Sequence, residues 1–195
     1  LEKKMDLQLT SELRQVLEQQ PYFAGLLLVI SALFISLPVA SIDDAIEDAQ
    51  RRICETLNLD LSALWQWSNK DAHIMTITHL HSPPEGPERP VDIDASKTFP
   101  WIYQKGLCGE TLAISTEQLP EEASLDRETR RFYGVKSSVI VPIQEGGKPI
   151  LGVVSFDTLY EERSWSKQDV KRIKLVTEIF SNALARKQSE QKIID

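Results

Sequence analysis

Apolar residues at helical spacing predict three long helices in the chain. The first carries a seam with steps of three, four or seven residues, as in a coiled coil, and Pro21 kinks or breaks it. The second begins at Ser41, which is expected to cap the helix together with Asp44, and it ends near Asn58. The third runs from about 166 to 192. The seam of the first helix consists of Leu9, Leu13, Val16, Phe23, Leu27 and Ile30.

The third helix has the clearest start signal. Ser166 and Asp169 have the spacing of a capping box. Its first half continues an apolar seam, whereas residues 186–192 are almost wholly polar, so we expect the far end to protrude from the domain. The seam consists of Ile173, Val176, Phe180 and Ala183.

The segment Pro21–Ile42 carries no charge for 22 residues, which is long enough to span a bilayer. Gly25, Pro38 and several serines interrupt it, and no cation flanks it closely. The alternative is a helix buried on nearly all sides, for which one sheet is not enough cover. We therefore expect the same helix of a second subunit to cover its other side, which predicts a homodimer.

Alternating apolar and polar residues predict two β-hairpins. Residues 61–67 and 73–81 form the first, and residues 137–144 and 148–160 form the second around the glycine turn at 145–147. A proline-rich loop is expected between the hairpins, followed by short elements. These are a loop at 81–97, a helix at 99–105, a strand at 111–115 and a helix at 121–133.

Composition narrows the class of protein. The chain has 195 residues, 42% of them hydrophobic, and a net charge of -7, which suits one globular domain with short extensions. Because no overall positive field is available for a phosphate backbone, a nucleic-acid binder is not expected. Two cysteines and no visible signal peptide favour a reducing, cytoplasmic location.

A set of short motifs resembles the GAF domain, a sensory module of bacterial signalling proteins. The set is similar to a subgroup found in sensor histidine kinases and related regulators. The motifs are Phe99-Pro100-Trp101, Gly109-Glu110, Leu119-Pro120-Glu121-Glu122-Ala123, Asp126-Arg127, Gly134-Val135-Lys136-Ser137, Val141-Pro142-Ile143, Gly146-Gly147, Gly152 and Arg163-Ser164-Trp165.

The resemblance implies an α+β fold, GAF-like and related to PAS domains. It implies a central antiparallel sheet with the N- and C-terminal helices packed on one face, and a small-molecule pocket on the other face. We divide the chain into an N-terminal helical linker at 1–20, the GAF domain at 21–187, and a C-terminal helical extension at 188–195 towards an absent output domain.

Sequence motifs of the common catalytic sites are absent. The chain contains no GxxxxGK[ST] loop, HExxH helix, CxxC pair or GxSxG elbow. The chain is therefore not expected to be an enzyme, and any kinase activity would reside in sequence outside it.

The histidines form the sharpest local pattern. His73, His79 and His81 share parity on one expected strand, and Cys108 is a third possible ligand for a metal or haem. His79 and His81 are weak metal candidates, because strand-end histidines are often merely half exposed. Cys108 is either a reactive thiol or, more simply, an inert one, and Cys54 is expected in the core. No covalently bound cofactor is expected.

Aromatic residues on the strands suit either a ligand pocket or the core, and Trp67 shares that ambiguity with Trp65. Trp101 is our first choice for a ligand contact, because it belongs to the segment expected over the pocket. The pocket candidates are Trp65, His79, Trp101, Cys108, Ser137 and Phe156.

A compact basic patch lies next to the expected pocket and would suit an anionic ligand. The simpler interpretation is a solvated helix face, because Asp126 and Arg130 have the spacing of an i, i+4 pair. The patch consists of Arg127, Arg130, Arg131, Lys136 and Ser137.

These observations predict a non-catalytic sensory module that binds a small molecule of unknown identity and signals through dimeric terminal helices, without inserting into a membrane. Two alternatives stay open: a ligand-free dimerisation spacer, and a metal-, haem- or thiol-dependent variant that uses Cys108 or His79 and His81. The dimer-interface candidates are Leu13, Phe23, Leu27, Ile30, Phe34, Ile173, Val176 and Phe180.

Overall fold

The structure is a computed structural model that describes residues 21–68, 71, 73–85, 88–144 and 149–194. Its contacts divide the chain into two compact units, one up to Pro38 and one from Val39 onwards, and each is described by itself. Leu9, Leu13 and Val16 of the predicted seam lie outside the described residues.

The first unit contains helix α2, Pro21–Ser36. The helix ends there because a proline disfavours helical backbone at the residue before it, and Pro38 follows Leu37. Within a single chain the two sides of α2 differ in burial. Phe23, Ala24, Leu27, Ile30 and Phe34 are buried, whereas Tyr22, Leu28, Val29, Leu33 and Ile35 are exposed.

Within the described ranges, no helix is both long enough and apolar enough to cross a membrane. The uncharged segment that suggested a span is broken after α2 and continues as the 3-10 turn η1, Val39–Ser41.

The second unit contains the remaining elements. Its helices are α3 Ile42–Leu57, α4 Ala95–Thr98, α5 Pro100–Leu107, α6 Ser124–Phe132 and α7 Lys167–Ile194, with 3-10 turns η2 Thr116–Gln118 and η3 Glu121–Ala123. Its strands are β1 Leu61–Trp67, β2 Ile74–His81, β3 Asp92–Asp94, β4 Leu112–Ser115, β5 Ser137–Ile143 and β6 Gly152–Thr158.

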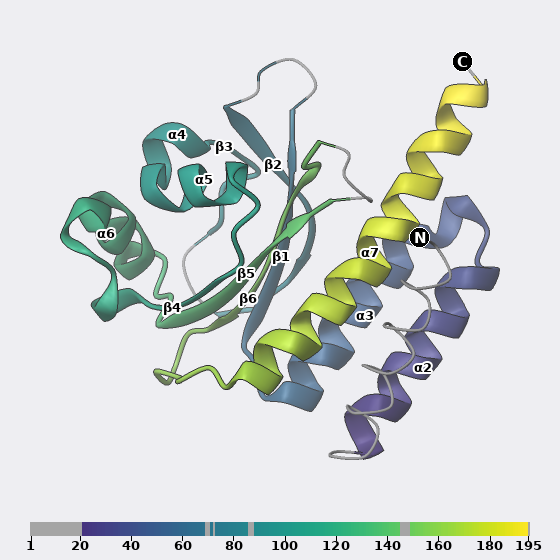
Figure 1. The fold of residues 1–195 in the computed structure, drawn as a ribbon, viewed down its shortest axis with the longest axis horizontal. Helices are drawn as coiled ribbons and strands as arrows, with labels where there is room; N and C mark the ends of the chain where they lie inside the picture. The colour runs from purple at the N-terminus through teal and green to yellow at the C-terminus, as the bar shows by residue number, and fades with distance from the viewer. Residues whose placement is uncertain (1–20, 69–70, 72, 86–87, 145–148, 195) are drawn as a thin grey trace. The chain divides into compact units, whose positions relative to one another are not determined.

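The described strands form one antiparallel sheet in the order β3-β2-β1-β6-β5-β4. Helices α3 and α7 cover one face, and α4, α5 and α6 lie on the other (Figure 1). Helix α3 packs on β1 and β2, and α7 packs on β5. Because α3 and α7 bury their apolar sides on the same face, this layer forms the main core and leaves the other face for a site.

A β-bulge changes which side chains of β2 face the core. Leu64 of β1 pairs with His79, but the next residue, Trp65, pairs with Ile77, so one residue of β2 is left over. His79 therefore lies on the α3 face, whereas His73 contacts Tyr103 of α5 on the opposite face. The predicted common parity therefore holds for His79 and His81, which pair with Leu64 and Ser62, and is wrong for His73.

The helix ends agree only in part with the sequence signals. Ser166 and Asp169 form the predicted capping box, in which the Asp169 amide donates to Ser166 Oγ at 3.0 Å and the Ser166 amide donates to Asp169 Oδ2 at 3.2 Å. Helix α3 is followed by Asn58 with a left-handed φ of 53°. Ser41 makes no side-chain hydrogen bond to cap α3, so that predicted cap is wrong.

Two connections hold more structure than predicted. The loop expected at 81–97 contains β3 and the start of α4, and the helix expected at 121–133 is split into η3 and α6. Gly134, with φ of 71°, ends the latter segment as expected. The predicted turn at 145–147 lies outside the described residues.

Candidate functional site

A cavity of about 110 Å³ lies in the second unit, on the sheet face opposite α3 and α7. Alternation along β1 sends Leu61, Ala63, Trp65 and Trp67 to this face, whereas Leu64 points the other way. The wall is therefore aliphatic at one end of β1 and aromatic at the other.

Helix α5 forms the opposite wall with Ile102, Tyr103 and Gly106. Its N-terminus is held by Asp126 of α6, whose carboxylate accepts hydrogen bonds from the backbone amides of Trp101 at 3.1 Å and Ile102 at 2.9 Å. A carboxylate suits this position because the first amides of a helix have no partner within the helix. Burial raises the pKa of Asp126, although these bonds oppose the effect.

The aromatic end of the cavity is joined to α5 by a second contact. The Tyr103 hydroxyl lies 2.9 Å from Nδ1 of His73, and the rings of Trp67 and Tyr103 meet edge to face with centroids 5.6 Å apart. Asp126 and His73 thus both hold the N-terminal half of the short helix above the sheet.

Arg130 of α6 lies at the polar end of the cavity and is only 4% exposed. Its Nε donates to Thr116 Oγ1 at 2.8 Å, and its Nη1 donates to Ser138 Oγ at 2.9 Å. Thr116 Oγ1 in turn donates to the Val135 carbonyl at 2.6 Å. Burial lowers the pKa of Arg130, opposed by the charges of Asp157 and Asp126, yet an arginine stays protonated in proteins.

Asp157 of β6 is the acidic group at this end. Ser138 donates to its Oδ1, and Ser155 donates to its Oδ2 at 2.9 Å. Burial raises the pKa of Asp157, although these two bonds and the charge of Arg130 oppose the rise.

Arg89 adds a second cation to the polar end. It donates to the Tyr133 carbonyl at 3.2 Å and lies over the Tyr133 ring, 5.5 Å from its centroid. Both residues line the cavity. The cavity thus has apolar and aromatic walls and one end rich in guanidinium donors.

Of the six pocket residues predicted from the sequence, Trp65 lines the described cavity. His79, Ser137 and Phe156 do not, because all three lie on the α3 and α7 face of the sheet, where Ser137 pairs with Thr158 and Phe156 with Ser62. Trp101 lies beside Lys105, whose Nζ is 5.7 Å from its ring centroid, and also falls outside the described lining.

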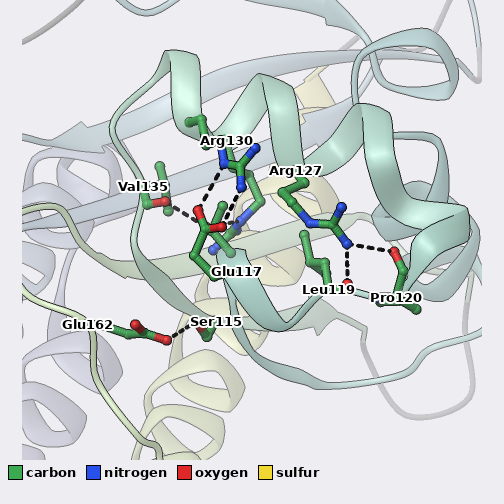
Figure 2. Close-up of polar contacts among 10 residues, drawn as sticks. Ser115, Glu117, Leu119, Pro120, Arg127, Arg130, Val135 and Glu162 are labelled. Atoms are coloured by element: carbon green, nitrogen blue, oxygen red, sulfur yellow. Dashed lines mark hydrogen bonds and ion pairs between the residues drawn. The ribbon is translucent and has the colours of Figure 1, made fainter.

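The predicted basic patch is divided among different roles. Arg127 donates to the carbonyls of Leu119 and Pro120 (Figure 2). Arg131 is exposed and pairs with Glu117. Only Arg130 reaches the cavity, and the solvated-face interpretation is wrong for it because its side chain is buried.

The histidines and Cys108 do not come together. His79 Nε2 lies 3.1 Å from Asp43 Oδ1, and its Nδ1 lies 2.9 Å from Thr78 Oγ1, whereas Cys108 follows α5 on the other side of the sheet and is exposed. Among the described residues, no group of three histidine, cysteine, aspartate or glutamate side chains is placed to hold a metal ion.

The predicted interface residues of α7 are already buried within one chain. Ile173, Val176 and Phe180 have 0% exposure. Phe23, Leu27, Ile30 and Phe34 of α2 are buried as well, and Leu13 lies outside the described residues.

Comparison with protein families decides the class. The family model of the GAF domain matches residues 41–184 of the chain. The chain belongs to the GAF family. None of the curated protein sequences matches it. The GAF match begins at the N-terminal end of α3 and ends within α7, and so includes every residue that lines the cavity.

Several solved structures share the fold at low sequence identity. The phycocyanobilin-bound GAF domain of a cyanobacterial phytochrome is 16% identical, with a TM-score of 0.70 over 86% of this chain and 96% of that one. Residues 122 to 287 of a methyl-accepting chemotaxis protein are 19% identical, with a TM-score of 0.66 over 81% and 96%. The GAF domain of a phosphoenolpyruvate-protein phosphotransferase from Coxiella burnetii is 15% identical, with a TM-score of 0.68 over 87% and 96%.

Sequence reasoning missed Arg89, Tyr133 and Asp157 as residues of the GAF cavity. Arg89 lies in the stretch interpreted as a loop, and no local pattern marks it. Asp157 had a usable signal, since a carboxylate inside an apolar strand must find partners when it is buried.

Proposed function

We propose that this GAF domain is a non-catalytic sensory module of a bacterial signalling protein, a histidine kinase being our first choice, and that the cavity binds a small molecule. The observation that carries the proposal is the cavity itself, which joins aromatic walls to a buried polar end. Such a combination of apolar surface and a few fixed polar groups is typical of ligand sites.

The signal would leave through α7, which packs on β5 across the sheet from the cavity. Side chains of β5 alternate, so Ile140 lines the cavity while its neighbour Val139 is buried on the α7 face. A ligand that displaces β5 therefore acts on both faces. A differential binding free energy of a few kcal/mol is enough to shift such an equilibrium substantially.

A polar contact gives α7 a second connection near its C-terminal end. Lys187 donates to Asp43 of α3, which also bonds to His79 of β2. Partial burial would raise the pKa of Asp43, but the bonds from Lys187 and His79 outweigh it and lower the pKa. Movement of β2 would thereby reach the part of α7 that leads towards an output domain.

We further propose that the module is a homodimer through α2. The candidates at its interface are now the exposed apolar residues Leu28, Val29 and Ile35, which are 52%, 55% and 79% exposed. Clustered apolar side chains of this kind favour association.

Binding at the cavity is tested by filling it. Native mass spectrometry of the freshly purified chain, followed by release of bound molecules, should show a retained metabolite. Ala63→Leu places extra carbon atoms in the cavity wall and should abolish retention, whereas Ala113→Leu on an exposed edge position of β4 should not. Hydrogen exchange of α7 should differ between loaded protein and Ala63→Leu. Equal retention in the parent and Ala63→Leu would contradict the proposal.

A further inference from the structure

Arg130, which lines the polar end of the cavity, has one unused donor. Two of the three guanidinium nitrogens of Arg130 bond to Thr116 and Ser138. The third, Nη2, is buried and has no hydrogen-bond partner among the described residues. A buried charged donor without a hydrogen-bond partner costs free energy of folding. An acceptor bound next to this atom would therefore be stabilising.

The carboxylates close to Arg130 bond to other donors and not to this atom. Both oxygens of Asp157 accept bonds from serine hydroxyls, Oδ1 from Ser138 and Oδ2 from Ser155. Asp126 is also close to Arg130, but its two oxygens accept the amides of α5. Arg89 contributes another cation at the same end. The site therefore offers donors to a ligand and needs acceptors from it.

The size of the cavity limits the ligand body. A protein cavity of about 150 Å³ holds one benzene molecule, and this cavity measures about 110 Å³. One ring or one branched aliphatic group is the appropriate size, and an open-chain tetrapyrrole is far larger. The wall formed by Trp65, Trp67 and Tyr103 suits such an apolar group.

We propose that the ligand is a small monocarboxylic acid with an aromatic or branched apolar body, whose carboxylate accepts a hydrogen bond from Arg130 Nη2. This inference rests on the proposed function, since it names the ligand class of the same cavity. Thr116 and Ser138 hold the guanidinium in place, so its free N–H bonds are oriented before the acid enters.

The test compares acids with a neutral analogue on the whole chain. Benzoate, phenylacetate and 3-methylbutanoate are titrated by two-dimensional NMR, with benzyl alcohol as the neutral probe. At least one acid should bind the parent protein about tenfold more tightly than benzyl alcohol, as expected for a charge-assisted bond. Shifts should appear at Trp65 and Tyr103.

Arg130→Gln should reduce binding of that acid at least about tenfold and leave benzyl alcohol nearly unchanged. Arg130→Lys keeps the charge and should restore part of the acid affinity. Arg131→Gln is the matched control, because Arg131 is the neighbouring residue but is exposed and paired with Glu117. It should leave acid binding unchanged.

Failure of this inference is distinguishable from failure of the proposed function. If benzyl alcohol binds and the acids bind no better, the acid assignment is overturned while ligand binding stands. If no probe binds and no metabolite is retained on purification, both are overturned. If Arg130→Gln does not fold, the ratio of acid to alcohol affinity in the parent protein and in Arg130→Lys still decides the question.

Discussion

Two buried side chains in the second unit are held by different kinds of contact, one by backbone amides and the other by neighbouring side chains. Asp126 stays buried because it accepts two backbone amides, and His79 stays buried because it lies between Asp43 and Thr78. Each joins elements that are distant in the sequence. Substitutions at these residues therefore report on the connections between elements.

Replacement of Asp126 should loosen α5. In Asp126→Ala the amides of Trp101 and Ile102 lose their acceptor, and the free energy of unfolding should fall by about 1–3 kcal/mol. Urea denaturation measures the loss, and hydrogen exchange should increase in α5. Glu128→Ala, at an exposed position of the same helix, should change stability by less than about 0.5 kcal/mol. Equal losses in the two variants would contradict this account.

Protonation of His79 should destabilise the fold in mild acid. Burial lowers the pKa of His79, opposed by Asp43 and Glu47 and assisted by Lys187. The unfolded state therefore takes up a proton at a higher pH than the folded state. Stability contributed by the neutral ring is complete above about pH 6.5 and is lost as the pH falls below that value.

Chemical denaturation at pH 7.5 and 5.5 measures this effect. The parent protein should lose more stability on acidification than His79→Gln does. Burial also lowers the pKa of His81, but His81 is present in both proteins. The difference between their pH responses therefore comes from His79. Asn182→Gln is the control at an exposed position of α7 and should behave like the parent. The same pH response in all three proteins would argue against the assignment.

At the scale of elements, β1 and β6 approach unusually closely at Gly152. A Cβ atom placed there would lie 1.9 Å from the carbonyl oxygen of Trp65, so the backbone of one strand would have to move. Trp65 is the residue at which the bulge changes the pairing with β2. The position of the cavity wall at Trp65 therefore depends on the absence of a Cβ atom at Gly152.

Gly152→Ala should therefore lower the free energy of unfolding by at least about 3 kcal/mol or prevent folding. Gly106→Ala is the matched control on α5, because its Cβ would meet Val153 Cγ1 at an ordinary 3.6 Å. That change should be tolerated and should narrow the cavity. Circular dichroism during urea unfolding measures both variants. A mild effect at Gly152 would show that β1 and β6 can separate without cost.

The sequence predicted the elements better than the faces they present. The alternation of apolar and polar residues located β1 and placed Trp65 at the cavity, because successive side chains of a strand point to opposite faces of the sheet. It misplaced His79, since a bulge leaves no mark on local alternation. The role of Arg130 was ambiguous for another reason. Its spacing from Asp126 fits an exposed ion pair, but it fits equally well the observed arrangement, in which Asp126 bonds to α5 and Arg130 to Ser138.

At the scale of the whole molecule, the family assignment followed from many weak motifs taken together. The six-strand order and the placement of α3 and α7 agree with the expected α+β fold. The interface candidates of α7 are buried within one chain, and a seam that packs on its own sheet has the same spacing as one that packs on a partner. Spacing alone does not say which surface covers a helix.

Dimerisation through α2 is tested at its exposed apolar side. Val29→Asp places a charge among apolar residues there and should shift the protein from dimer to monomer in sedimentation velocity at micromolar concentration. Asn182→Asp, at an exposed position of α7, should leave the dimer intact. A parent protein that sediments as a folded monomer would refute the proposed dimer.

The hydrogen-bonded residues Thr116, Arg130, Ser138 and Asp157 at the polar end of the cavity lie in four separate segments, η2, α6, β5 and β6. During synthesis, Asp157 is the last of these to leave the ribosome. Until then the hydroxyl of Ser138 has no carboxylate to bond, and the Arg130 guanidinium remains hydrated. A nascent chain that stops short of β6 should consequently lack the complete set of polar groups at this end of the cavity.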